Sequence, residues 1–253
     1  MNRRFSDTDF AVPRIPLEGP VAPIELLQGS ASGDDCGGES RATDSIVRSS
    51  LSGTAAVFTP EGYEPNYAYP LVVWFHDAGE DERVLRRIMP TVSERNAIGL
   101  ALRGERSLRS GGFDWPVTDP HRRAQALFDR VRDLRREHHV HTERVVLAGR
   151  GTGAAAAAGL FFAKPEWFGG LALLDLPAES LPVHLVSSDE LAGKPVLLDL
   201  PVEQLGRGRD GASRFSAAGL DVTFRHARSS GLCRSTLLHV NRWLMATVCG
   251  VPV

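Results

Sequence analysis

Short apolar segments alternate with helix-prone segments from Thr54 almost to the end of the chain, and this alternation limits the possible folds more than any other feature. Most of the apolar segments, such as LVVWFH (71–76), are apolar on both faces, as in a sheet that is covered on both sides. A chain that alternates strand and helix forms a mostly parallel sheet with helices on both faces. The sequence therefore predicts an α/β fold, a three-layer sandwich. The expected strands are 54–60, 71–76, 97–104, 144–149, 168–177, 194–203 and 220–227.

Segments 80–96 and 121–139 carry apolar residues at the helical period. The first helix is expected to break near Pro90, because proline removes a backbone donor. Four side chains of the second helix are expected to face the sheet: Ala126, Leu127, Val131 and Leu134. The remaining expected helices are 152–165, 206–219 and 232–250.

The first 50 residues differ from the rest, because they are rich in Gly, Ser and Asp and lack a sustained period. They predict a flexible or loosely docked N-terminal arm, in which VAPIELL (21–27) is either a strand or a docking segment. Residues 51–253 are expected to form one domain, since a chain of 253 residues with 42% hydrophobic content supports a single sizeable core.

Composition and charge exclude several classes of function. A net charge of -2 gives no basis for binding nucleic acid. Cys36, Cys233 and Cys249 form neither a disulfide framework nor a metal-binding pair. No apolar run is long enough to span a membrane, and the first ten residues lack the apolar core of a secretory signal. We therefore expect a cytoplasmic protein that needs no cofactor or metal, and whose partner is an unknown small molecule or protein.

The segment RVVLAGRGTGAAAAAGL (144–160) reads as a strand that turns sharply into a helix through three alternating glycines. In parallel sheets the site forms from the loops that follow the carboxyl ends of the strands, an edge that we call the rim. The sequence places six loops there: 76–79, 103–107, 149–153, 175–180, 199–204 and 226–231.

Three stretches in this order resemble the α/β-hydrolases of the phospholipase/carboxylesterase (predicted esterase) group. They are YPLVVWFHDAGEDE (69–82), RVVLAGRGTGA (144–154) and VNRWLM (240–245). The resemblance covers about 54–248 and not the N-terminal arm. It implies the α/β-hydrolase fold, with a nucleophile at the strand–helix turn (the nucleophile elbow), a histidine base, an acid and two backbone N–H donors for an oxyanion.

The resemblance places Gly151 where the family has its serine nucleophile and Ser230 where it has its histidine. Glycine has no side chain to attack an ester. The acid position falls at Glu203, with Asp175 as a second candidate, and either could equally be a surface carboxylate that pairs with arginine. His226 and His239 lie within an expected strand and helix, so packing or exposure explains them better than a base does.

The expected oxyanion donors are the backbone N–H groups of Ala78 and Thr152. Asp77 replaces a family glycine beside them, and its charge should disfavour an oxyanion unless the side chain turns outward. The pocket rim is expected to comprise His76, Asp77, Arg150 and Asp175.

The sequence thus favours a degenerate esterase that is catalytically inactive and acts as a binding or interaction module. Two alternatives remain open. One is an active carboxylesterase with an unorthodox nucleophile, drawn from the set Thr152, Ser107, Ser229 and Ser230. The other is a protein that binds a small anion through the glycine turn with Arg150, Arg103 and Arg106. The HHVH run (138–141) could suggest a metal site, but it lacks a nearby carboxylate or cysteine in ligand spacing and is expected to be a solvated connector.

Overall fold

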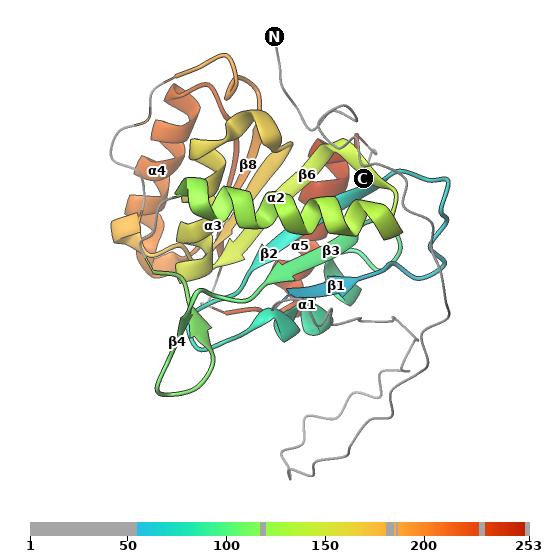
Figure 1. Cartoon of the computed structure of the whole chain (residues 1–253). Helices are drawn as coiled ribbons and strands as arrows, with labels where there is room; N and C mark the ends of the chain where they lie inside the picture. The colour runs from blue at the N-terminus through green and yellow to red at the C-terminus, as the bar shows by residue number, and fades with distance from the viewer. Residues whose placement is uncertain (1–54, 117–119, 181–184, 186, 228–230, 251–253) are drawn as a thin grey trace, which may run out of the picture.

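The computed structural model describes residues 55–250, apart from 117–119, 181–184, 186 and 228–230. A seven-stranded sheet runs through the centre of this part of the chain, in the order β1-β3-β2-β6-β7-β8-β9 (Figure 1). β1 pairs antiparallel with β3, and the other pairs are parallel. The predicted mostly parallel sheet is confirmed. Its strands are β1 Ala55–Phe58, β2 Tyr69–Phe75, β3 Ile98–Leu102, β6 Val140–Arg150, β7 Gly170–Leu174, β8 Pro195–Pro201 and β9 Asp221–Ala227.

Helices cover both faces of the sheet, as Figure 1 shows. The strand side chains alternate between two hydrophobic clusters, because successive residues of a strand point to opposite faces. In β2, for example, Val73 and Phe75 join the cluster under α2, α3 and α4, whereas Val72 and Trp74 join the cluster under α1 and α5. The helices are α1 Leu85–Val92, α2 Pro120–Glu137, α3 Thr152–Ala163, α4 Leu205–Ala217 and α5 Arg234–Trp243.

Short turns and a hairpin complete the described chain. The two-stranded hairpin of β4 (Arg106–Ser107) and β5 (Phe113–Asp114) projects near the carboxyl ends of β2 and β3. The single-turn elements are η1 Glu82–Val84, η2 Pro165–Trp167, η3 Ala178–Ser180, η4 Val202–Gln204 and the π-turn η5 Leu244–Val248. No helix in the described residues is both long and apolar enough to cross a membrane.

Three local predictions need correction. Pro90 lies inside α1, which continues to Val92 because the buried Met89 and Val92 hold its last turn against the sheet. Ala126 is exposed on α2, and Ala124 takes the inward position one turn before Leu127. Half of the connector 138–141 belongs to β6, which begins at Val140 through its pairing with Tyr69. The predicted N-terminal arm lies outside the described residues, so its boundary near residue 50 stays a prediction.

Candidate functional site

The turn between β6 and α3 has a backbone that glycine adopts most readily. Gly151 has φ 55° and ψ -127°, and it is the residue immediately before the first turn of α3. Its N–H donates to Leu174 O at 3.0 Å, which fixes the turn against β7. Gly153 allows the close approach of α3 to β2, because a Cβ there would lie 2.2 Å from His76 O. The segment therefore has the sharp strand–turn–helix geometry of an elbow, with no side chain at its tip.

The carboxylate of Asp77 lies in the space beside this tip. Its Oδ1 accepts hydrogen bonds from the N–H of Ala78 at 2.8 Å and from the N–H of Thr152 at 3.1 Å. A Cβ built on Gly151 would lie 1.9 Å from the same oxygen, well inside any permitted contact. The two backbone donors expected for an oxyanion thus both point at an oxygen atom of Asp77, whose side chain turns inward.

Arg150 is engaged by two carboxylates. Its Nη2 lies 3.3 Å from Asp77 Oδ2 and 3.5 Å from Glu80 Oε1. Glu80 also accepts the N–H of Asp77 through Oε2 at 3.2 Å. The charge of Arg150 is therefore balanced within the protein. Asp77 is held through both carboxylate oxygens and through its own N–H.

The hydroxyl of Thr152 donates to Asp114 Oδ1 at 2.8 Å. Burial alone would raise the pKa of Asp114, but hydrogen bonds from Arg106, from the Trp115 N–H and from Thr152 together lower it. A carboxyl with a lowered pKa is a weak base. Asp114 therefore orients the Thr152 hydroxyl rather than activating it.

His76 lies beneath the rim rather than on it, which corrects its predicted place, because its side chain is completely buried. Its Nε2 accepts the N–H of Gly104 at 2.9 Å, so the tautomer with the proton on Nδ1 donates to Asp77 O at 2.8 Å. The indole N–H of Trp115 donates to His76 O at 2.8 Å. These bonds use both ring nitrogens to join the loops after β2 and β3.

The carboxylates after β7 and in β8 are held by other groups. Asp175 adopts φ 48°, and its Oδ2 accepts the N–H of Gly231 at 2.7 Å. Burial raises its pKa, and the Gly231 hydrogen bond offsets part of that rise. Asp199 is buried in β8 and pairs with Arg225 at 3.0 Å. Burial also raises the pKa of Asp199.

The remaining predicted positions do not assemble into an acid–base pair in the described part of the chain. Glu203 is exposed in η4. His226 is exposed on β9, and within the described residues neither it nor His239 hydrogen-bonds to Asp175 or Glu203. Burial lowers the pKa of His239 on α5. Ser230 and Ser229 lie outside the described residues, and Ser107 is exposed in β4.

Sequence reasoning missed two residues that shape the site. Glu80 bridges Asp77 and Arg150, and Asp114 holds the Thr152 hydroxyl. Asp114 comes from the β4–β5 hairpin, 38 residues before its partner, within a segment that shows no periodic pattern. No signal in the sequence indicated that contact.

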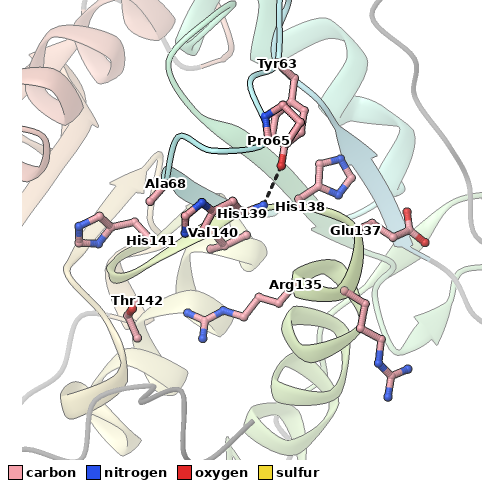
Figure 2. A pocket seen from close by; sticks show the side chains of 11 residues that line it. Tyr63, Pro65, Ala68, Arg135, Glu137, His138, His139, Val140, His141 and Thr142 are labelled. Atoms are coloured by element: carbon pink, nitrogen blue, oxygen red, sulfur yellow. Dashed lines mark hydrogen bonds between the residues drawn. The ribbon is translucent and has the colours of Figure 1, made fainter. Parts of the chain in front are cut away.

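A separate hollow of about 500 Å³ lies at the opposite edge of the sheet, between the end of α2, the start of β6 and the loop 63–68. Figure 2 shows His138, His139 and His141 around it, with the Tyr63 hydroxyl accepting the N–H of His139 at 2.7 Å. The described residues contain no group of three side chains placed to hold a metal ion. Arg135 and Arg136 at its edge complement the negative end of the α2 dipole.

The comparisons with known proteins identify the fold. The sequence matches no protein-family model and no curated protein. The structure resembles the carboxylesterase of Bacillus cereus with a TM-score of 0.62 and 18% identity, over 78% of this chain and 95% of that one. A carboxylesterase from Mesorhizobium loti gives 0.63 and 19%, over 80% and 99% of the two chains. YahD, solved with malic acid, gives 0.54 and 17%, over 76% and 98%.

Proposed function

We propose that this chain, which has the α/β-hydrolase fold of esterases and carboxylesterases, has lost ester hydrolysis and acts as a binding or interaction module. One observation carries the proposal: the tip of the elbow is Gly151, a residue with no nucleophilic atom. Loss of the nucleophile removes most of the catalysis in an enzyme of this kind. Backbone donors alone retain only a small part of the rate enhancement.

The environment of the turn supports the same view. Thr152 directly follows the tip, and its hydroxyl donates a hydrogen bond to Asp114. Both nitrogens of His76 are used in holding loops together. An unorthodox nucleophile would therefore have to act without Asp114 or His76 as its base.

The anion-binding alternative has weaker support. Arg150 is paired with Asp77 and Glu80, Arg103 with Glu82, and Arg106 with Asp114. An external anion would have to compete with a carboxylate at each guanidinium.

The proposal includes a cytoplasmic location, which is compatible with the free thiols of Cys233 and Cys249. Its partner, a small molecule or another protein, is left open.

Turnover of p-nitrophenyl esters by the purified protein, together with labelling by a fluorophosphonate probe mapped by mass spectrometry, tests the loss of hydrolysis. We expect no turnover above the buffer rate and no labelled residue. The matched variants are Thr152→Val, Ser107→Ala and Glu203→Ala. Turnover that disappears in any of them, or a label on a rim hydroxyl, would overturn the proposal. Turnover that persists unchanged in all of them, without a label, marks a contaminating esterase, which further purification removes.

A further inference from the structure

The N–H groups of Ala78 and Thr152, which we call the donor pair, converge on one point in space. Both lie within hydrogen-bond distance of a single oxygen atom, at 2.8 and 3.1 Å. Two backbone donors at such distances from one oxygen form a site for a negatively charged oxygen. The donor pair is therefore an anion-binding site by its geometry, whatever chemistry the rim performs.

In this protein the anion is a side chain of the chain itself. Asp77 comes directly before Ala78, so the loop that supplies one donor also supplies the acceptor. A group attached in this way acts at a high effective concentration, because it loses little freedom on binding. A free carboxylate from solution must compete with that advantage.

The space for Asp77 exists because residue 151 is glycine. A Cβ at that position would lie 1.9 Å from Asp77 Oδ1 and 2.3 Å from its Cγ, so a side chain at 151 and the inward carboxylate exclude each other. The two departures from the esterase pattern, Gly151 and Asp77, thus fit together as one arrangement.

The charges around the donor pair also oppose a second anion. Asp77 shares Arg150 with Glu80. Burial raises the pKa of the adjacent Asp175, and the charge of Asp77 adds to that rise. Two carboxylates therefore pair with one guanidinium while Asp77 is in place, and the carboxyl of Asp175 lies near enough to feel both charges. Without the Asp77 side chain, two free N–H donors would remain on one side of the rim, beside an Arg150 that is paired with Glu80 alone.

We propose that Asp77 is a resident anion that fills the donor pair, that the intact rim therefore rejects carboxylate ligands, and that removal of this one side chain turns the rim into a binding site for small carboxylates. The inference deepens the proposed function and rests on it, since a donor pair that is occupied in this way cannot serve an ester carbonyl. It also names the ligands that the binding module excludes.

Acetate titration followed by amide NMR tests the proposal, with the resonances of Ala78 and Thr152 as readouts. In the wild-type protein we expect both resonances to stay in place up to about 100 mM acetate. In Asp77→Ala we expect both to move together and to saturate, with a dissociation constant at least about tenfold lower than any wild-type value. Asp77→Asn is the matched control, because its amide oxygen still fills the donor pair, and it should behave like the wild type.

Three results would overturn the inference: saturable shifts of both amides in the wild type, no saturable shift in a folded Asp77→Ala protein, or equal binding by Asp77→Asn and Asp77→Ala. Asp77→Gly replaces Asp77→Ala if the latter does not fold, and the wild-type titration decides the first result without any variant. Acetate binding by a wild-type sample that shows no ester turnover would overturn this inference and leave the proposed function standing, so the two failures are distinguishable.

Discussion

Asp77 Oδ1 lies 1.9 Å from the position that a Cβ on residue 151 would occupy, and this single relationship joins two loops that are far apart in the sequence. Asp77 follows β2, and Gly151 follows β6, the neighbouring strand of the sheet. The glycine at position 151 and the inward carboxylate of Asp77 are therefore one structural feature.

The first prediction concerns Gly151→Ser. The positive φ should cost about 1–3 kcal/mol in a serine, and displacing the Asp77 carboxylate should cost about as much again. Urea unfolding should therefore show a clear loss of stability. In the Asp77→Gly background the same substitution should lower the free energy of unfolding by a smaller amount. The difference between the two backgrounds, which is the coupling energy of the two sites, should be about 0.5–3 kcal/mol.

Gly159→Ala is the matched control for that experiment, because it lies in α3 and a Cβ there would meet nothing within 4 Å. It should stabilise the protein by about 0.5–1 kcal/mol, the usual gain over glycine inside a helix. Equal costs of Gly151→Ser with and without Asp77 would contradict the mutual exclusion.

The second prediction concerns the ion pair between Glu82 and Arg103, whose two hydrogen bonds measure 2.8 and 2.6 Å. The hydrogen bonds from Arg103 lower the pKa of Glu82 below its usual 4.5. The ionised form therefore adds stability above that pH, and this stability is lost as the pH falls through the lower folded-state pKa. Glu82→Gln should cost about 1–3 kcal/mol at pH 7 and much less in strong acid.

Unfolding in urea at neutral and at acid pH measures this difference. The exposed Glu94→Gln serves as the control and should change stability by less than about 0.5 kcal/mol at either pH. A cost for Glu82→Gln that is the same at both pH values would show that the ion pair does not account for it.

The third prediction concerns Asp199, whose effect on stability changes with pH in the opposite direction to that of Glu82. Burial raises its pKa above the usual 3.8, and within the described residues its Oδ1 has no hydrogen-bond partner. The wild-type protein therefore loses stability as the pH rises from 3.8 through the folded-state pKa. Asp199→Asn removes that loss, so its stability relative to the wild type should improve from acid to neutral pH.

Asp221→Asn on the exposed start of β9 is the comparison variant, and its stability relative to the wild type should change little with pH. The Asp199 prediction fails if Asp199→Asn becomes relatively less stable as the pH rises. That result would mean that the pairing with Arg225 outweighs the cost of burial.

The fourth prediction concerns Cys233, an exposed thiol directly before α5. Hydrogen bonds from Ser235 and Thr236 lower its pKa to about 7. Alkylation by iodoacetamide, followed peptide by peptide, should show a rate that rises with a midpoint near that pH, because the thiolate is the reactive form. Ser235→Ala should move the midpoint upward. Cys249, whose pKa is raised by burial, should react more slowly at neutral pH.

The sequence alone determined the fold class and the glycine at position 151. The alternation of apolar strands and helices is a local pattern, and the hydrophobic effect converts it into buried strands between two layers of helices. Gly151 is a matter of covalent structure, since no arrangement of neighbours can give glycine a hydroxyl.

Only the tertiary structure decided where the side chains of the rim point. Asp77 meets the N–H of Thr152 across 75 residues, and Thr152 meets Asp114 across 38. The direction of a loop side chain depends on such distant partners, which leave no periodic signal in the sequence. For the same reason the sequence did not predict that His76 is buried. Nor did it predict that the Asp77 carboxylate accepts hydrogen bonds from the two expected oxyanion donors.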